Sequence, residues 1–320
     1  MKYRQLGRSG VTVSEIGFGA WGIGGSTEGL TSYGDTDDQV SLKALGRALD
    51  RGITFFDTSS VYGYGRSETL IGQAFKAHRD RVVIATKAGF RRWSEKPDFS
   101  PDAIVHSCEQ SLARLQTDHI DLLQLHNPDL ETLRRDEVIA TLEKLVRHGK
   151  ACAWGLSMRS PGEALTALAG AKPAVLQVNL NMLDVRAVTS GLLDAARRDG
   201  IGIITRTPLC FGFLSGAIGP NIIFPPGDHR RGWPAAQIEA WRTGAARVLA
   251  AVPKPAGSSA TQAALRFCLS FPAVATVIPG MLTADEVDEN VTASEMGALP
   301  QPAIDAILAI NRERSFFVGG

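Results

Sequence analysis

Four side chains of different chemistry lie at or near the ends of short apolar segments. Asp57, Lys87 and His126 each end or directly follow an apolar run that predicts a buried strand, and Tyr62 follows Asp57 in a glycine-rich loop. A lysine at the end of an apolar strand is costly unless it has a partner or a function. Separately, Asp57 could cap a turn, Tyr62 could pack on the surface, and His126 could be a core histidine. Together, a carboxylate, a phenol, an amine and an imidazole could exchange a proton with a substrate.

The elements that would position these residues alternate regularly along the chain. Apolar segments predict eight strands, at 16–20, 53–56, 81–87, 119–126, 151–157, 174–177, 201–205 and 275–278. Helices are predicted at 38–50, from about 65 to 75, and at 101–115, 131–148, 161–169, 188–198 and 258–270. Strands this apolar are buried on both faces, which indicates a parallel sheet. Eight such units in 320 residues favour an α/β fold, the closed (β/α)8 TIM barrel.

Three further segments lie outside this alternation. Residues 3–6 and 11–14 flank a glycine-rich turn and predict an N-terminal β-hairpin, and extra helices near 285 and 304 follow the last strand. The stretch 220–234 is a long irregular insertion, and such loops are usually functional. No change in composition marks a second domain, so we predict that residues 1–320 form a single domain.

Composition excludes several classes of function. A net charge of +1 argues against nucleic acid or an anionic membrane as the main partner. Four widely spaced cysteines without a CxxC pair, and six histidines without HxH or HExxH, argue against a structural metal site and a disulfide framework. The chain begins with a polar stretch and has no apolar run long enough for a membrane span. We expect a soluble, cytoplasmic protein without a metal.

Several motifs, in order, resemble the aldo-keto reductase family. They are DTSSVYGYGRSE, IATKAG, LLQLHNPD, WGLS, LQVN and VIPG followed by ENV, and they cover nearly the whole chain. The resemblance implies transfer of a hydride from a reduced nicotinamide to the carbonyl of an aldehyde or ketone. It also implies that Tyr62 is the general acid, Lys87 lowers its pKa, Asp57 pairs with Lys87, and His126 orients the carbonyl.

These roles set a physical requirement on the site. A free tyrosine has a pKa of about 10, so acting near pH 7 needs a shift of ~3 units, or ~4 kcal/mol. A cation ~4 Å away contributes only ~1 kcal/mol in water but ~4 kcal/mol at an effective dielectric constant of ~20. Lys87 therefore suffices only if the pocket is largely dry, and burial itself opposes the shift.

The resemblance also assigns cofactor contacts. Ser157 and Gln177 match positions that bind the nicotinamide carboxamide, although both could simply cap strand ends. Arg206 matches a position where many members stack an aromatic ring; it could stack there or face an acidic or hydroxylated substrate. The pyrophosphate loop implies contacts from Pro208, Leu209, Gly212, Leu214 and Ser215. The adenosine end implies contacts from Ile278, Gly280, Met281, Leu282, Glu286, Glu289 and Asn290.

The adenosine end departs from the family. NADP(H) is the usual cofactor, but Gly280, Met281, Leu282 and Glu286 stand where basic residues normally bind the 2′-phosphate, so NAD(H) is an option. The basic segment 229–231 could replace the missing charge, or could be a solvated turn. Two more departures are Met158, where the family often has asparagine, and Ala217, near the place of a lysine.

Aromatic residues indicate the class of substrate. Trp21, Tyr62, His126 and Trp93 would line the pocket, and Trp233 could join them. Such walls suit aromatic aldehydes and sugars alike. Two other functions stay open: NAD-dependent oxidation of a sugar or alcohol, and a catalytically slow regulatory or redox-sensing subunit. The partner expected is a small carbonyl compound; no oligomeric state is predicted.

Overall fold

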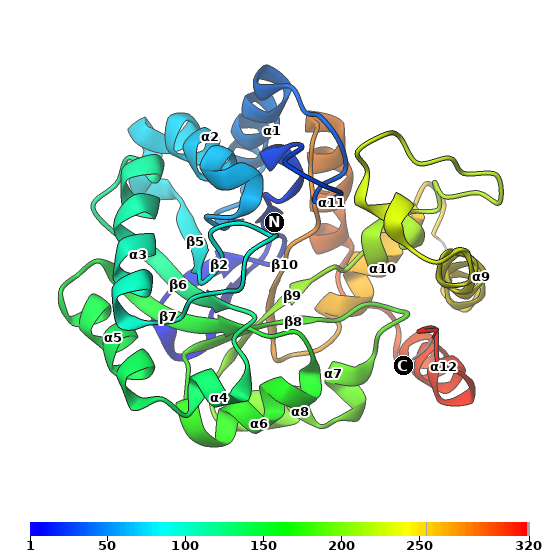
Figure 1. Ribbon diagram of the computed structural model, residues 1–320. Helices are drawn as coiled ribbons and strands as arrows, with labels where there is room; N and C mark the ends of the chain where they lie inside the picture. Colours follow the sequence, from blue (N-terminus) through cyan, green and yellow to red (C-terminus); the bar gives the residue numbers. More distant parts are fainter. Residues whose placement is uncertain (254, 319–320) are drawn as a thin grey trace.

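Eight parallel strands form a barrel at the centre of the molecule (Figure 1). The computed structural model describes residues 1–253 and 255–318. In order around the sheet the strands are β3 (Phe18–Gly19), β4 (Phe55–Asp57), β5 (Val83–Ala88), β6 (Ile120–His126), β7 (Ala151–Ser157), β8 (Val175–Asn179), β9 (Gly202–Arg206) and β10 (Val274–Val277). The first and last strands meet because the Gly17 amide donates to the Val277 carbonyl at 2.8 Å. The predicted (β/α)8 fold is confirmed.

Helices surround the outer face of the barrel (Figure 1). They are α1 (Asp38–Asp50), α2 (Arg66–Phe75), α3 (Pro101–Leu115), α4 (Leu130–Leu133), α5 (Asp136–Arg147), α6 (Pro161–Ala171), α7 (Arg186–Thr189), α8 (Leu192–Arg198), α9 (Ala235–Ala250), α10 (Ala260–Leu269), α11 (Ala284–Met296) and α12 (Gln301–Glu313). Polar side chains start several of them: Asp37 accepts from two amides of α1, and Ser100 caps α3 directly before Pro101. A large apolar cluster fills the space between helices and strands.

The predicted hairpin closes the N-terminal end of the barrel. Strands β1 (Tyr3–Gln5) and β2 (Thr12–Ser14) pair antiparallel, and Leu6 and Val13 are buried in the same apolar cluster as side chains from the barrel strands. Gly7 has a φ of +55°, and a Cβ there would lie 2.1 Å from the Gly202 nitrogen. Only glycine permits this approach of hairpin to barrel.

Two helical predictions need correction, and one helix was not predicted. The predicted helix 131–148 is two helices, α4 and α5, and 188–198 is broken at Gly191, which has a φ of +77°. Helix α9 follows the 220–234 insertion and was missed. It buries Gln237 and Gly244 beside Trp241, and Gly244 leaves room for Phe316. Because a polar residue and a glycine occupy buried positions, its apolar pattern is weak.

No helix in the described part of the chain is both long and apolar enough to span a membrane.

Candidate active site

A cavity of about 630 Å³ opens at the carboxyl ends of the strands. The segments that follow β3, β4, β5, β6, β9 and β10 all contribute to its lining. In a barrel of this kind, the loops at this end are where catalytic groups gather. Asp57, Tyr62 and His126 line the cavity, and Lys87 lies directly beneath it, fully buried.

Lys87 joins the carboxylate to the phenol. Its Nζ donates to Asp57 Oδ1 at 2.5 Å and to the Thr58 carbonyl at 2.8 Å, and it lies 3.4 Å from Tyr62 Oη. An ammonium has three hydrogens, so these contacts use all of them. Asp57 balances the charge that would otherwise make burying the lysine very costly. The cation is therefore held against the phenol, in a place from which water is largely excluded.

The second oxygen of Asp57 is also fully engaged. Oδ2 accepts from Gln177 Nε2 at 2.7 Å and from Gln124 Nε2 at 3.1 Å. Gln177 in turn accepts from Ser157 Oγ at 3.1 Å. Gln177 lines the cavity, whereas Ser157 and Gln124 lie behind it and are fully buried. Gln124 was not predicted from the sequence, although it is a polar residue within an apolar strand.

His126 is a neutral imidazole. Burial first, and then the positive charges of Lys87 and Arg206, hold the pKa of His126 well below its ordinary value. Its Nδ1 lies 3.2 Å from Ser59 Oγ, which accepts from the Val61 amide at 3.5 Å and so has its own hydrogen free to donate. Nδ1 then accepts, and Nε2 carries the proton of the neutral ring.

Arg206 is fixed in the cavity wall by four hydrogen bonds. Nε donates to Asn179 Oδ1 at 2.9 Å and Nη1 to Ser157 Oγ at 3.1 Å, while Nη2 donates to Asn127 Oδ1 at 3.2 Å and to the Met158 carbonyl at 2.8 Å. Burial lowers the pKa of this guanidinium, which nevertheless stays charged. Asn127 and Asn179 were not predicted from the sequence, although each lies at or just past a strand end.

Aromatic rings form the wall opposite the strand ends. Trp21 lies 5.1 Å from Tyr33 and 6.5 Å from Tyr62, between ring centroids, and Trp93 lies 6.4 Å from Tyr62. Trp21, Tyr33 and Trp93 all line the cavity, whereas Trp233 packs against other rings outside the lining. Tyr33 was not singled out from the sequence.

The segment after β9 is a strained loop along the cavity. Thr207, Cys210 and Phe211 all have positive φ, which is unusual for residues with a Cβ. Of the loop residues proposed from the resemblance, four line the cavity: Pro208, Leu209, Gly212 and Ser215. Leu214 is fully buried in the apolar core instead.

The far end of the cavity carries few positive charges. It is lined by Ile278, Gly280, Met281, Leu282 and Glu286, whereas Glu289 and Asn290 are outside the lining. The Glu286 carboxylate is held by backbone amides at the start of α11. Its Oε2 accepts from the Leu282 amide at 2.6 Å and from the Thr283 amide at 3.1 Å. Among the residues that line the cavity, the arginines are Arg206 and Arg230.

The basic segment 229–231 is only partly a solvated turn. Arg230 lines the cavity and pairs with the buried Asp228 at 2.6 Å, while Arg231 is exposed. His229 is buried against Trp21, with ring centroids 4.8 Å apart, and burial lowers the pKa of His229 to about 4. At neutral pH it therefore adds no positive charge to the cavity.

Comparison with known proteins gives a consistent result. The chain matches the aldo/keto reductase family over residues 15–312. It is 35% identical to aldo-keto reductase YhdN of Bacillus subtilis over 72% of this chain and 69% of that protein. It is 31% identical to a probable voltage-gated potassium channel subunit beta of Oryza sativa subsp. japonica, over 97% of this chain and 96% of that one. The glycerol dehydrogenase AKR11B4 of Gluconobacter oxydans has a similar structure, with a TM-score of 0.81 and 26% identity over 99% and 97% of the two chains.

Proposed function

Because this chain belongs to the aldo/keto reductase family of NAD(P)H-dependent oxidoreductases, we propose that it reduces an aldehyde or ketone with Tyr62 as the general acid. The observation that carries the proposal is the contact of Lys87 with both Asp57 and the Tyr62 phenol in a buried site. We propose that residues 1–320 act as one reductase domain. The cytoplasmic location expected from the sequence stays a prediction.

The chain's own residues handle the proton. A reduced nicotinamide, when bound, would supply the hydride that the carbonyl carbon accepts. Tyr62 Oη would donate its proton to the carbonyl oxygen, which completes the alcohol. The Lys87 ammonium stabilises the phenolate that remains, most strongly where water is excluded. The Nε2 proton of neutral His126 orients the carbonyl and stabilises the charge that develops on its oxygen. The Tyr62 phenolate then regains a proton from water.

The cofactor contacts are proposed on the same basis. Gln177, oriented by Ser157 from behind the cavity, would bind the carboxamide. The guanidinium plane of Arg206 would stack on the nicotinamide, and the loop after β9 would hold the pyrophosphate. Arg206 already donates to four fixed acceptors, which favours stacking over binding of an acidic substrate. Residues 278–290 would hold the adenosine. Since Gly280, Met281 and Leu282 are uncharged and Glu286 is acidic, we propose that NAD(H) binds at least as well as the usual NADP(H).

The wall of Trp21, Tyr33 and Trp93 favours substrates with an aromatic ring or the apolar face of a sugar. Oxidation of an alcohol by the same site is the second candidate. The weak positive charge at the adenosine end favours NAD(H), and a structurally similar protein is a glycerol dehydrogenase. A regulatory role, suggested by the name of the potassium channel relative, would combine tight cofactor binding with slow turnover.

One assay separates these functions. We expect the native protein to oxidise NADH or NADPH in the presence of aromatic or sugar aldehydes, and Tyr62→Phe to bind cofactor but turn over at least about 100-fold more slowly. Tyr64→Phe is the matched control because Tyr64 lies outside the cavity lining. Full activity of Tyr62→Phe would disprove the proposed acid. If both variants and the native protein bind cofactor but reduce nothing, the reverse assay with sugars and NAD⁺ decides between oxidation and regulation.

A further inference from the structure

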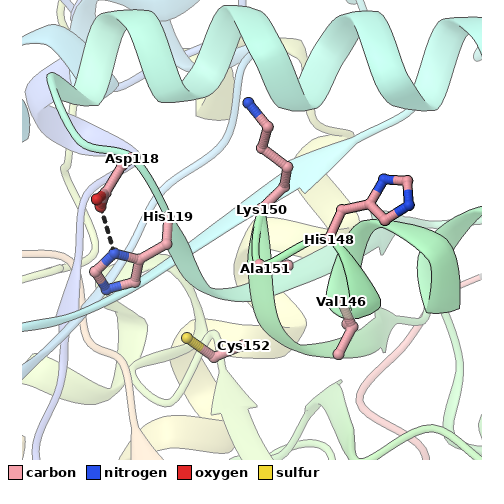
Figure 2. A pocket seen from close by; sticks show the side chains of 8 residues that line it. Asp118, His119, Val146, His148, Lys150, Ala151 and Cys152 are labelled. Atoms are coloured by element: carbon pink, nitrogen blue, oxygen red, sulfur yellow. Dashed lines mark hydrogen bonds and ion pairs between the residues drawn. The ribbon is translucent and has the colours of Figure 1, made fainter.

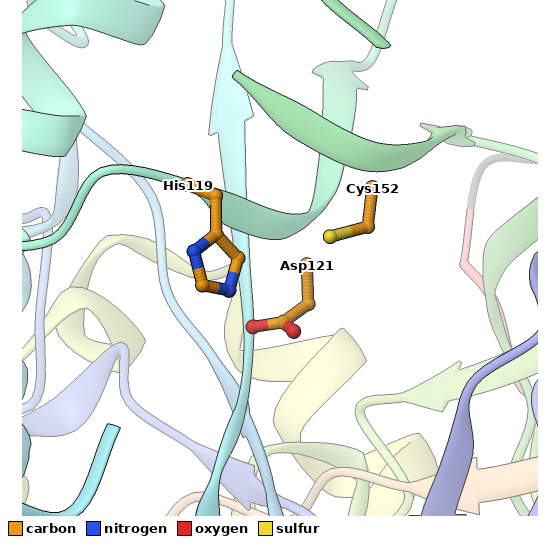
Figure 3. Close-up of side chains that lie close together, drawn as sticks. All are labelled: His119, Asp121 and Cys152. Carbon is orange, nitrogen blue, oxygen red and sulfur yellow. The ribbon is translucent and has the colours of Figure 1, made fainter. Parts of the chain in front are cut away.

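A cluster of three metal-binding side chains lies at the end of the barrel opposite the cavity. His119 directly precedes β6, Asp121 is the second residue of β6, and Cys152 is the second residue of β7. The register pairs Ile120 with Ala151, so Asp121 and Cys152 are neighbours across the two strands. Alternate residues of a strand share a face, which places His119 on the same side as Asp121. Figure 3 shows the three side chains lying close together.

We propose that His119, Asp121 and Cys152 form a binding site for a zinc ion. Imidazole, carboxylate and thiolate are the three side-chain ligands that Zn²⁺ uses in proteins. One ligand atom from each residue lies within 4.8 Å of the others. Ligand atoms in a tetrahedral zinc site are about 3.5 Å apart, given bond lengths of about 2.0–2.3 Å. The atoms must therefore approach more closely, which requires the His119 and Cys152 side chains to turn toward Asp121, with water as the fourth ligand.

The surroundings already orient two of the ligands. Asp118 Oδ1 lies 2.7 Å from His119 Nδ1, drawn as a dashed line in Figure 2. Among the described residues, Nε2 has no hydrogen-bond partner. A carboxylate bound to the second nitrogen of a histidine is a common feature of zinc sites. Asp121 Oδ2 accepts from Arg79 at 2.6 Å and from the Ile84 amide at 2.8 Å, which fixes the side chain and leaves Oδ1 without a partner among the described residues.

Two features oppose zinc binding: the positive charge of Arg79 and the proton on the Cys152 thiol. The Arg79 cation lies beside Asp121, but Asp118, Asp121 and a thiolate together carry more negative charge than Arg79 balances. Burial raises the pKa of the Cys152 thiol, so the ion must displace its proton. Zinc binding releases the thiol proton, so the affinity for zinc should rise with pH.

The ion would link the starts of β6 and β7. This site is far along the strands from Tyr62, and the amino ends of barrel strands serve stability rather than catalysis. Zinc binding there therefore does not depend on the reductase activity. The site could not be predicted from spacing along the chain, because Cys152 lies far from His119 in sequence. The register between β6 and β7 brings the two residues together.

Thiol protection gives a direct test in the folded protein. Cys152 is exposed, whereas Cys108, Cys210 and Cys268 are buried, so an alkylating reagent reports on Cys152. We expect one equivalent of Zn²⁺ to protect Cys152, and Co²⁺ to give the absorption of a thiolate-bound tetrahedral ion. His119→Gln and Cys152→Ser should each weaken zinc binding about 100-fold or more in competition with a chelating dye.

His148→Gln is the matched control. His148 borders the same hollow, but Figure 2 shows its ring directed away from His119 and Cys152. The His148→Gln variant should bind zinc as the native protein does. Zinc should raise the melting temperature of this variant and of the native protein. If His119→Gln binds zinc within about threefold of the native protein, His119 is not a ligand and the proposed site is wrong. Absence of protection in the native protein would equally overturn it.

Discussion

The amide nitrogen of Gln177 donates to Oδ2 of Asp57 at 2.7 Å. The side chain proposed to hold the nicotinamide carboxamide is thus hydrogen-bonded to the carboxylate that pairs with Lys87. If a carboxamide takes the Gln177 amide, Asp57 keeps Gln124 as its remaining side-chain donor on that oxygen. Cofactor binding and the charge beside Tyr62 are therefore coupled through one glutamine.

Gln124→Leu should impair catalysis without weakening cofactor binding. Gln124 touches Asp57 but is fully buried behind the cavity. A hydrogen bond to a charged group contributes about 1.5–3 kcal/mol, so we expect kcat to fall at least ~10-fold and its pH profile to shift. Fluorescence titration would give the cofactor Kd, which should change less than about twofold. Gln177→Leu should weaken both cofactor binding and catalysis. Equal cofactor affinities in Gln124→Leu and Gln177→Leu would contradict these separate roles.

Lys87→Met should be strongly destabilising as well as inactive. It leaves the Asp57 carboxylate buried without its cation, and breaking such a pair costs about 3–5 kcal/mol. Adding Asp57→Asn removes the uncompensated charge, so the double variant should regain much of the stability while staying inactive. Urea unfolding of the native protein, both single variants and the double variant gives the coupling free energy. Additive effects would show that the pair contributes little.

Arg206→Lys should weaken cofactor binding although it keeps the charge. Lysine cannot make the planar set of contacts with Asn179, Ser157 and Asn127, nor present a flat face to a ring. We expect the Kd of the cofactor to rise about 10-fold or more, with a smaller change in the KM of the aldehyde. A larger effect on an acidic aldehyde than on the cofactor would instead assign Arg206 to the substrate.

His229 should make the fold sensitive to acid. Burial lowers the pKa of His229 to about 4, below its value of about 6.5 in the unfolded chain. The unfolded chain then binds more protons between these values, so stability falls as the pH drops through this window. Between pH 7 and pH 5, the free energy of unfolding of His229→Gln should therefore fall by about 1–2 kcal/mol less than that of the native protein. Urea unfolding at both pH values measures this difference. If the variant keeps the pH dependence of the native protein, folding does not lower the pKa of His229.

The strands, and many of the residues at their ends, could be predicted because most of the apolar runs stop at a polar side chain. That pattern alone was enough to place Asp57, Lys87 and His126 at the same end of a barrel. Sequence order does not reveal cross-strand register, which brings Gln124 to Asp57 and Cys152 to Asp121. Nor does it reveal a helix such as α9, where Gln237 and Gly244 occupy buried positions because Phe316 packs there.

The hairpin closes the amino end of the barrel, so the cavity opens to solvent only at the carboxyl ends of the strands. Leu6 and Val13 close the other end, so water reaches Lys87 and Tyr62 from the carboxyl side alone. Substrate and cofactor seated in that opening would separate the phenolate from bulk water. We therefore expect Tyr62 to regain its proton only after the alcohol begins to leave, which ties the recovery of the acid to product release.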